Sequence, residues 1–380
     1  MSDQTQIPLM IFNFNEAYEV PIYNYVKKNE YRFLSWGSDN VYPQLLLDLY
    51  ENYGSPLHKA IINKKEKLIS GFGFKEVLDP SLRDYIDYND LNLLARQITR
   101  DFELFNCFAI EVIWDKSRTK MKLHYIPVHT LRFGLNEDGT EVDNYFWFSK
   151  DWSKFKKKGF EPEYVKRYDP SIRDERSIFY YTHPSAYGMD FYGSPGYSNG
   201  INYVSLDYEI GQYHLNFTKQ GFQSSAMIYF GTGIPPAEEQ RQFYNEFMRS
   251  YSGTKNSGRV MLSWGEGDDQ KPQFTTVKNE GSDERFIMLK ETVEENIILA
   301  HEIPLALLVS TPGKLASTDE RKELLQEFQL YYISDRQTQI EANLNKLLKD
   351  QGFTEKLEFK TYLDTQEQSQ IVKQEITTNI

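Results

Sequence analysis

Apolar side chains recur at helical spacing through much of the first hundred residues. Residues 44–53 carry one such face. Ser55 followed by Pro56 is typical of an N-cap with proline at the first helical position, and the helix that they open closes at Gly71. A third amphipathic stripe covers 91–105. The pattern therefore predicts three helices in this part of the chain.

Between residues 107 and 184 the pattern changes to that of β-structure. Aromatic and β-branched side chains cluster in short runs, of which 108–114, 121–126 and 145–148 are the clearest. Turn residues rich in Asp, Asn and Gly separate these runs. We therefore predict a β-rich region between two helical ones.

A small mixed region is predicted in the second half of the chain. A helix over about 203–220 leads into it. Its strands and helix are expected at 225–230, 237–251, 259–263 and 273–277, in the order strand, helix, strand, strand. This order of short strands around one helix predicts a compact insertion.

Two further helices follow the insertion. Ser282 caps the first, whose apolar period continues until Pro304. Ser317 and Glu320 form a capping box for the second, which is expected to run to about Asp350 without interruption, roughly 45 Å. The predicted apolar stripe of this long helix is Leu324, Phe328, Tyr331, Ile340, Leu344 and Leu347.

Composition limits the classes of protein that fit these elements. The chain has 380 residues, enough for one large or two modest domains, and it is 40% hydrophobic and 15% aromatic, which indicates a well-packed fold. Its net charge of −12 disfavours gripping nucleic acid or an anionic membrane through bulk charge. The single cysteine, Cys107, excludes an internal disulfide and is expected to be buried. No apolar stretch is long enough for a transmembrane helix, and Asp3 argues against a signal peptide.

Motifs for catalysis are missing from the sequence. None of the six histidines has metalloprotease spacing, and His124 and His129 make only a weak metal pair. The glycine-rich segment 188–200 lacks the Gly-Lys-[Ser/Thr] ending of a P-loop, and turn chemistry explains its glycines. The basic run of 154–158 fits a solvated loop or a local contact with nucleic acid. We therefore assign no catalytic residue, no metal and no cofactor.

The order of the elements resembles the portal proteins of tailed bacteriophages, in the short siphophage-type family. Six short segments carry the resemblance in the same order: Ser35–Pro43, Asn52–Ile62, Phe105–Glu111, Tyr192–Pro195, Phe217–Phe222 and Glu302–Leu308. Three of them depart from the family pattern. Phe105 replaces a glycine, the Tyr192 loop is one residue short, and one proline of a pair is missing, since Pro304 is followed by Leu305.

The resemblance implies an α+β portal fold with an α/β wing, a helical stem, a small α/β clip, a long wing helix and a minimal crown. Carried onto this chain, the layout is a wing over 1–202, stem helices over 203–221 and 282–303, a clip over 222–281, a tunnel loop with the long wing helix over 304–350, and a short crown or tail over 351–380.

The resemblance also implies a function. Portal proteins form a ring, usually of twelve subunits, at one capsid vertex, and double-stranded DNA passes through the channel during packaging and ejection. The implied partners are other copies of the chain, DNA, the terminase, the head–tail adaptor and the major capsid protein. The implied location is the virion, after assembly in the host cytoplasm, with no enzymatic activity of the chain itself.

Three groups of candidate site residues follow from this layout. The tunnel loop would contain Ser310, Thr311, Pro312, Gly313 and Lys314. Channel-facing stem candidates are Glu284, Glu291, Glu294 and Glu295. Clip contacts would be Lys255, Arg259 and Trp264.

Each group has an ordinary alternative. Lys314 fits a solvated loop lysine equally well, the stem acids could pair with neighbouring subunits instead of facing DNA, and the clip charges could simply be exposed. For the whole chain, one alternative is an acidic, aromatic-rich carbohydrate-active enzyme or glycan-binding protein, in which Trp36, Trp114, Trp147 and Trp264 could stack on sugars. The other is a different head–tail structural protein.

Overall fold

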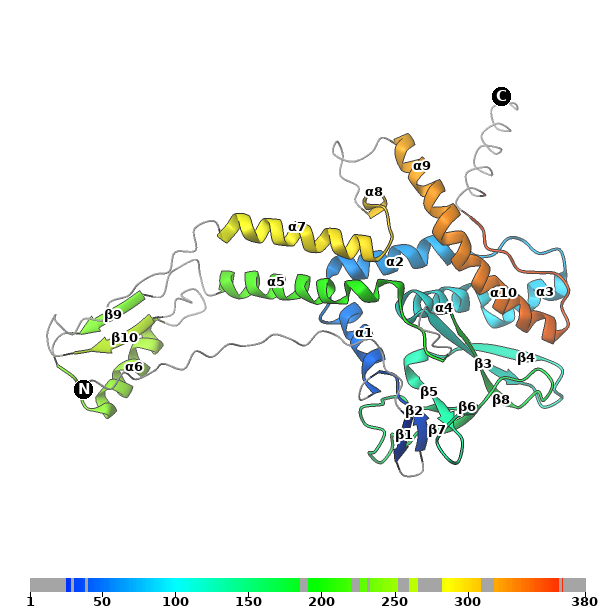
Figure 1. Ribbon diagram of the computed structural model, residues 1–380, viewed down its shortest axis with the longest axis horizontal. Helices are drawn as coiled ribbons and strands as arrows, with labels where there is room; N and C mark the ends of the chain where they lie inside the picture. The colour runs from blue at the N-terminus through cyan, green and yellow to red at the C-terminus, as the bar shows by residue number, and fades with distance from the viewer. Residues whose placement is uncertain are drawn as a thin grey trace. The chain divides into compact units, whose positions relative to one another are not determined.

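The computed structural model divides the chain into two compact units (Figure 1). The first comprises Met1–Val204 and Asn296–Ile380, and the second comprises Ser205–Glu295. The residues that the structure describes are 25–28, 31–37, 40–184, 191–219, 226–230, 233–251, 260–265, 282–308, 318–361 and 364. Both helices and sheets occur, as the predicted α+β class requires.

An eight-stranded sheet forms the base of the first unit, in the order β1-β2-β5-β6-β7-β8-β3-β4. Neighbouring strands are antiparallel except β7 and β8, which are parallel. The strands are β1 (Tyr25–Lys28), β2 (Tyr31–Leu34), β3 (Cys107–Trp114), β4 (Met121–Tyr125), β5 (Leu131–Leu135), β6 (Val142–Phe148), β7 (Glu163–Arg167) and β8 (Arg176–Thr182). The predicted β-rich region is confirmed, but the β1–β2 hairpin was not predicted.

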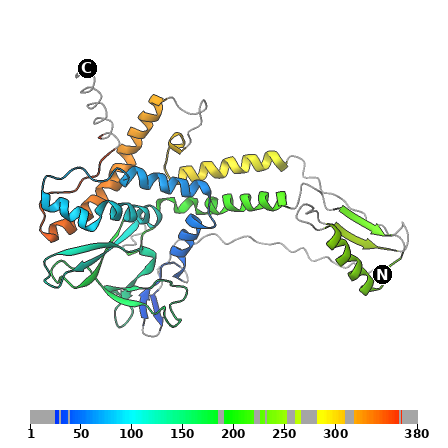
Figure 2. The ribbon, with the colours of Figure 1, turned by 180° about the vertical axis from the view of Figure 1, so that it is seen from behind.

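Helices pack against this sheet, and Figures 1 and 2 both place α2, α4 and α10 on one side of it. The helices of this unit are α1 (Tyr42–Glu51), α2 (Pro56–Ser70), α3 (Pro80–Asn89), α4 (Leu91–Phe105), α8 (Leu305–Leu308), α9 (Thr318–Phe328) and α10 (Ser334–Gln351). The predicted N-cap is confirmed, because Ser55 Oγ accepts hydrogen bonds from the backbone N–H groups of Leu57 and His58. Helix α3 was missed by the sequence analysis.

Aromatic side chains explain two of the family-like segments. Trp36 is fully buried and stacks on Tyr192, with ring centroids 4.5 Å apart. The Tyr192 hydroxyl donates to the carbonyl of Leu34 and accepts from the N–H of Phe133. The guanidinium of Arg132 also lies near the Trp36 ring. Trp36 is thus a core residue and leaves no face for stacking on a sugar. Cys107 is likewise buried, as predicted.

The predicted long helix is interrupted by a π-helical segment, η5 (Gln329–Ile333), between α9 and α10. Phe328 and Ile333 are both buried although they are five residues apart, which is one residue more than an α-helical turn supplies. The extra residue shifts the phase of the helix. The prediction that Tyr331 belongs to the apolar stripe is therefore wrong: it is 75% exposed, and Ile333 takes the buried place.

The second unit contains the predicted insertion and most of two long helices. Its elements are α5 (Ile201–Lys219), β9 (Ala226–Phe230), α6 (Ala237–Tyr251), β10 (Val260–Trp264) and α7 (Ser282–Ala300). Strands β9 and β10 pair in parallel, and the rings of Phe230 and Phe243 are in contact at 5.2 Å, which packs α6 against β9. The strand predicted at 273–277 lies outside the described residues.

Candidate functional site

Helices α5 and α7 correspond to the two stem helices in the layout that the resemblance implies. Each has 19 residues, and both views show them side by side (Figures 1 and 2). A Cβ atom on Gly200 would lie 2.5 Å from the Cβ of Ala300, so glycine is needed where the chain enters α5 beside the end of α7. A close contact therefore joins the two helices at this end.

The acidic candidates on α7 do not share one environment. Glu291 and Glu295 are exposed and lie four residues apart, which places them on the same face of the helix. Glu294 is half-buried, and its carboxylate lies 3.6 Å from Lys290 Nζ within the same helix. Glu284 belongs to α7, but its side chain lies outside the described part of the structure. Of the four candidates, Glu291 and Glu295 are thus the two whose described side chains form an exposed acidic face.

The remaining candidates lie mostly outside the described residues. This holds for the whole tunnel-loop group, Ser310, Thr311, Pro312, Gly313 and Lys314, and for Lys255 and Arg259 of the clip group. Trp264 is the last residue of β10, opposite Phe230 in the parallel register, and nothing is described of its side chain. These residues stay predictions.

A buried cluster of ionisable side chains joins α2, α4, η5 and α10, and the sequence analysis did not identify it. Lys65 Nζ donates to the hydroxyl of Tyr332 at 2.6 Å, and that hydroxyl donates to Glu103 Oε2 at 2.7 Å. Arg336 Nε lies 3.5 Å from Glu103 Oε1. Burial lowers the pKa of Lys65 to about 8, although Glu103 opposes the shift. Only Glu103 gave a sequence signal, as a charged residue between apolar neighbours, because Lys65 and Arg336 lie in polar stretches.

Two histidines that are far apart in the sequence meet beside this cluster. His58 Nδ1 and His301 Nε2 are 2.8 Å apart, and both side chains are buried. The ring of Tyr197 stacks on His301 with centroids 4.8 Å apart. Burial lowers the pKa of His58 to about 3 and that of His301 well below its usual value, so both rings are neutral. The pair ties the end of α7 to α2.

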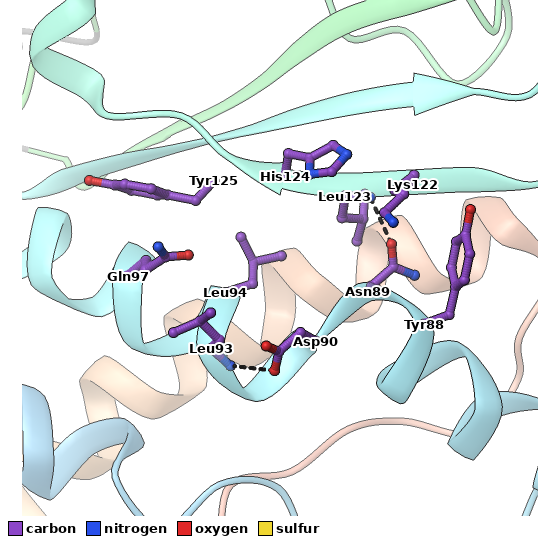
Figure 3. A pocket seen from close by; sticks show the side chains of 10 residues that line it. All are labelled: Tyr88, Asn89, Asp90, Leu93, Leu94, Gln97, Lys122, Leu123, His124 and Tyr125. Atoms are coloured by element: carbon purple, nitrogen blue, oxygen red, sulfur yellow. Dashed lines mark hydrogen bonds between the residues drawn. The ribbon is translucent and has the colours of Figure 1, made fainter.

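A small cleft of about 240 Å³ lies between the start of α4 and strand β4 (Figure 3). Strand β4 is an edge of the sheet, so its outward N–H groups need partners. Asn89 Oδ1 accepts from the N–H of Leu123 in the cleft, and Gln351 Oε1 accepts from that of Met121. These side chains seal the edge against pairing with another strand. Asn89, which lines the cleft, thus serves the edge of the sheet.

Metal and membrane sites find no support within the described ranges. No three His, Cys, Asp or Glu side chains there are grouped closely enough to hold a metal ion, and His124 and His129 belong to no such group. The described helices also include none whose length and apolar character would let it cross a membrane.

Similar folds occur in gene transfer agent particles. A chain of the structure "Neck of empty GTA particle computed with C6 symmetry" shares 17% identity, with a TM-score of 0.52 over 84% of this chain and 85% of that one. A chain of "Virion of native gene transfer agent (GTA) particle" shares 16%, with a TM-score of 0.54 over 89% and 88%. A chain of "Neck of native GTA particle computed with C12 symmetry" shares 16%, with a TM-score of 0.54 over 87% and 88%. At these identities the likeness concerns the fold.

The sequence itself identifies the family. No curated protein matches the chain. In contrast, the family model described as "Phage portal protein" matches residues 93–380, which is well over half of the chain. The match confirms the resemblance to portal proteins, and four of the six short segments lie within the matched residues. It leaves the carbohydrate-binding alternative without support. The chain belongs to the phage portal protein family.

Proposed function

We propose that twelve copies of this chain form a ring at one vertex of a phage capsid, and that double-stranded DNA passes through the ring during packaging and ejection. Two observations support this role: the family match, and the fold shared with chains from the necks of gene transfer agent particles. The proposed location is the virion, after assembly in the host cytoplasm. We place the ATP-driven work in the terminase and assign the ring the tasks of gate and docking platform.

The observation that carries the proposal is the exposed apolar surface of α7. Ile287, Met288 and Leu299 are 60%, 66% and 75% exposed in the single chain. Large apolar side chains gathered on one helix mark a surface that another protein covers. In a ring, the neighbouring subunits would cover it. The surplus of Tyr and Phe in the composition supports large interfaces of the same kind.

The domain layout belongs to the same proposal. It assigns the wing to 1–202, the stem helices to 203–221 and 282–303, the clip to 222–281, the tunnel loop and long wing helix to 304–350, and the crown or tail to 351–380. The boundaries of the second compact unit, Ser205 and Glu295, support a stem and clip that are distinct from the wing.

The charges of α7 fit a wall past which DNA slides. Glu291 and Glu295 form an exposed acidic face, and such a face repels phosphates at every register. A strongly basic wall would hold the DNA in place, because phosphate neutralisation dominates the affinity for nucleic acid.

Around the helix axis the two acids lie about 40° and 80° from Ile287, between Ile287 on one flank and Met288 and Leu299, at about 100° and 120°, on the other. We therefore propose Glu291 and Glu295 as channel-facing residues between two flanks that contact neighbouring subunits, and Lys314 as the one basic contact of the tunnel loop. The clip region would dock the terminase and then the head–tail adaptor, and the wing would meet the major capsid protein.

The mass of the purified chain in solution tests the proposal. Twelve copies of a 44.7 kDa chain predict a particle of about 540 kDa by native mass spectrometry and a ring with a central hole by electron microscopy. A chain that stays monomeric at all concentrations and salt conditions would contradict the ring, and monomers that bind saccharides would favour the carbohydrate alternative.

A further inference from the structure

Helix α9 is the least buried helix of the first unit for which side chains are described. From Glu320 to Glu327 no residue is buried, and the apolar side chains of Leu324 and Leu325 are only half-buried. The first buried side chain is that of Phe328, at the end of the helix. A helix with so little of its surface covered gains little stability from its own chain, which points to a partner.

One face of α9 borders a groove of about 400 Å³ between α2, α8 and α9. The floor is apolar and the rim is basic. The floor is formed by Leu68, Phe72, Leu307 and Leu325, and the rim by Lys64, Arg321 and Lys322. Neither Lys64 nor Arg321 makes an ion pair with any described residue.

The opposite face carries a ridge of the complementary character. We define the ridge as Glu323, Glu327, Leu330 and Tyr331, all of which are exposed, and Leu330 is 66% exposed. Within the described part of the chain, neither glutamate has an ion-pair partner. The ridge thus combines two large exposed side chains, Leu330 and Tyr331, with two carboxylates that have no ion-pair partner among the described residues, and it faces away from the groove.

Helix geometry places groove and ridge on opposite sides. At 3.6 residues per turn, Glu327 lies about 200° from Leu325 around the axis, and Glu323 lies about 200° from Arg321. The π-helical segment extends the ridge. Because Phe328 and Ile333 both face the core, the extra residue between them leaves Leu330 and Tyr331 directed outward.

We propose that the ridge of one subunit docks into the groove of the next subunit in the ring, with Leu330 and Tyr331 on the apolar floor and Glu323 and Glu327 beside Lys64 and Arg321. This inference rests on the proposed ring and names its contact. The occupant is a second copy because the two surfaces match in charge and polarity and lie on opposite faces of one helix. Such a head-to-tail interface repeats around a closed ring.

Charge reversal in both surfaces tests the pairing. Glu327→Lys and Arg321→Glu each place like charges together at every interface, whereas the double variant restores opposite charges. Each single variant should raise the concentration for half-assembly about tenfold, measured by analytical ultracentrifugation, and the double variant should return it toward the wild-type value. Glu137→Lys, which changes an exposed acid in the β5–β6 turn by the same charge, should assemble like wild type.

The outcomes separate this inference from the proposed function. Wild-type chains that form no ring would contradict both. A wild-type ring with unaffected single variants, or a double variant that is not rescued, would overturn the pairing alone. An Arg321→Glu ring that assembles normally but retains less double-stranded DNA would make the groove a DNA contact and also overturn the pairing. Circular dichroism of each variant checks that it is folded.

Discussion

At the scale of single residues, close backbone approach explains a glycine that the sequence analysis attributed to turn chemistry. A Cβ atom on Gly193 would overlap the carbonyl oxygen of Phe105 and would lie 2.7 Å from the carbonyl carbon of Asn106. Asn106 itself adopts φ of 57° to end α4, and its Oδ1 accepts from Arg336 Nη1. The Tyr192-Gly-Ser-Pro segment and the Asn106 segment thus depend on each other in space.

The change Gly193→Ala should therefore lower the free energy of unfolding by about 1–3 kcal/mol, because the backbone must move to admit the methyl group. Chemical denaturation followed by tryptophan fluorescence measures the effect. Gly196→Ala is the matched control, since a Cβ there meets open space, and it should change the free energy of unfolding by less than about 0.5 kcal/mol. Equal effects of the two changes would refute the close-approach argument.

At the scale of elements, periodicity predicted most helices and the clearest strands, but it missed the β1–β2 hairpin, the helix α3 and the π-helical segment. The helix α3 was missed although Asp79 caps it, Pro80 begins it, and Leu82, Tyr85 and Ile86 are buried at helical spacing. The π-helical segment was missed because a spacing of five residues between Phe328 and Ile333 differs by only one residue from the spacing of four that an α-helical apolar face shows. Burial of Gln329 and Gln337, whose side chains are hydrogen-bonded to each other, accompanies the shift in phase.

The contact between α2 and the end of α7 predicts a dependence of stability on pH. Unfolded histidine takes up a proton near pH 6.5, whereas the native pKa of His58 is about 3, so stability falls as pH drops from 6.5 toward 3. Each pH unit below 6.5 lowers the free energy of unfolding by about 1.4 kcal/mol for each histidine that stays neutral in the native state. Between pH 7 and pH 5, His58→Phe should lose about 2 kcal/mol less than wild type in denaturant titrations.

His124→Gln is the control for this experiment, because His124 is exposed, and it should follow wild type. Asp101 acts in the opposite sense, since burial raises its pKa to about 7, but it is present in every variant and cancels in the comparison. If the free energy of unfolding fell by the same amount in wild type and in His58→Phe between pH 7 and pH 5, the claim that the buried histidines are neutral in the native state would be wrong.

At the scale of the whole molecule, the net charge of −12 changes its meaning once a channel is proposed. It argues against a protein that grips DNA, and it suits a ring through which DNA moves. Twelve copies would carry a strongly negative total charge, so basic contacts with DNA would be confined to narrow rings such as the one proposed at Lys314. The acid surplus therefore specifies how DNA is handled.

The change Lys314→Ala should reduce the number of DNA-filled particles while leaving ring assembly unchanged, because it removes the one basic contact proposed in the tunnel loop. Nuclease protection of packaged DNA measures the first quantity, and electron microscopy of purified rings measures the second. Lys116→Ala, in the exposed turn between β3 and β4, is the matched control and should package normally. Normal DNA retention in the Lys314 variant would show that the loop assignment is mistaken.

By itself, the sequence determined most of the helices, the β-rich character of residues 107–184, the cap at Ser55, the burial of Cys107 and the resemblance to portal proteins. These follow from local periods and short motifs, which neighbouring residues carry. Only the tertiary structure decided that His58 meets His301, that Lys65 meets Glu103, and that Tyr331 faces outward. Such contacts join residues that are up to 243 positions apart, and no local pattern records them. The two faces of α9 belong to this second class, because charge and apolar side chains become complementary only once the fold places them on opposite sides.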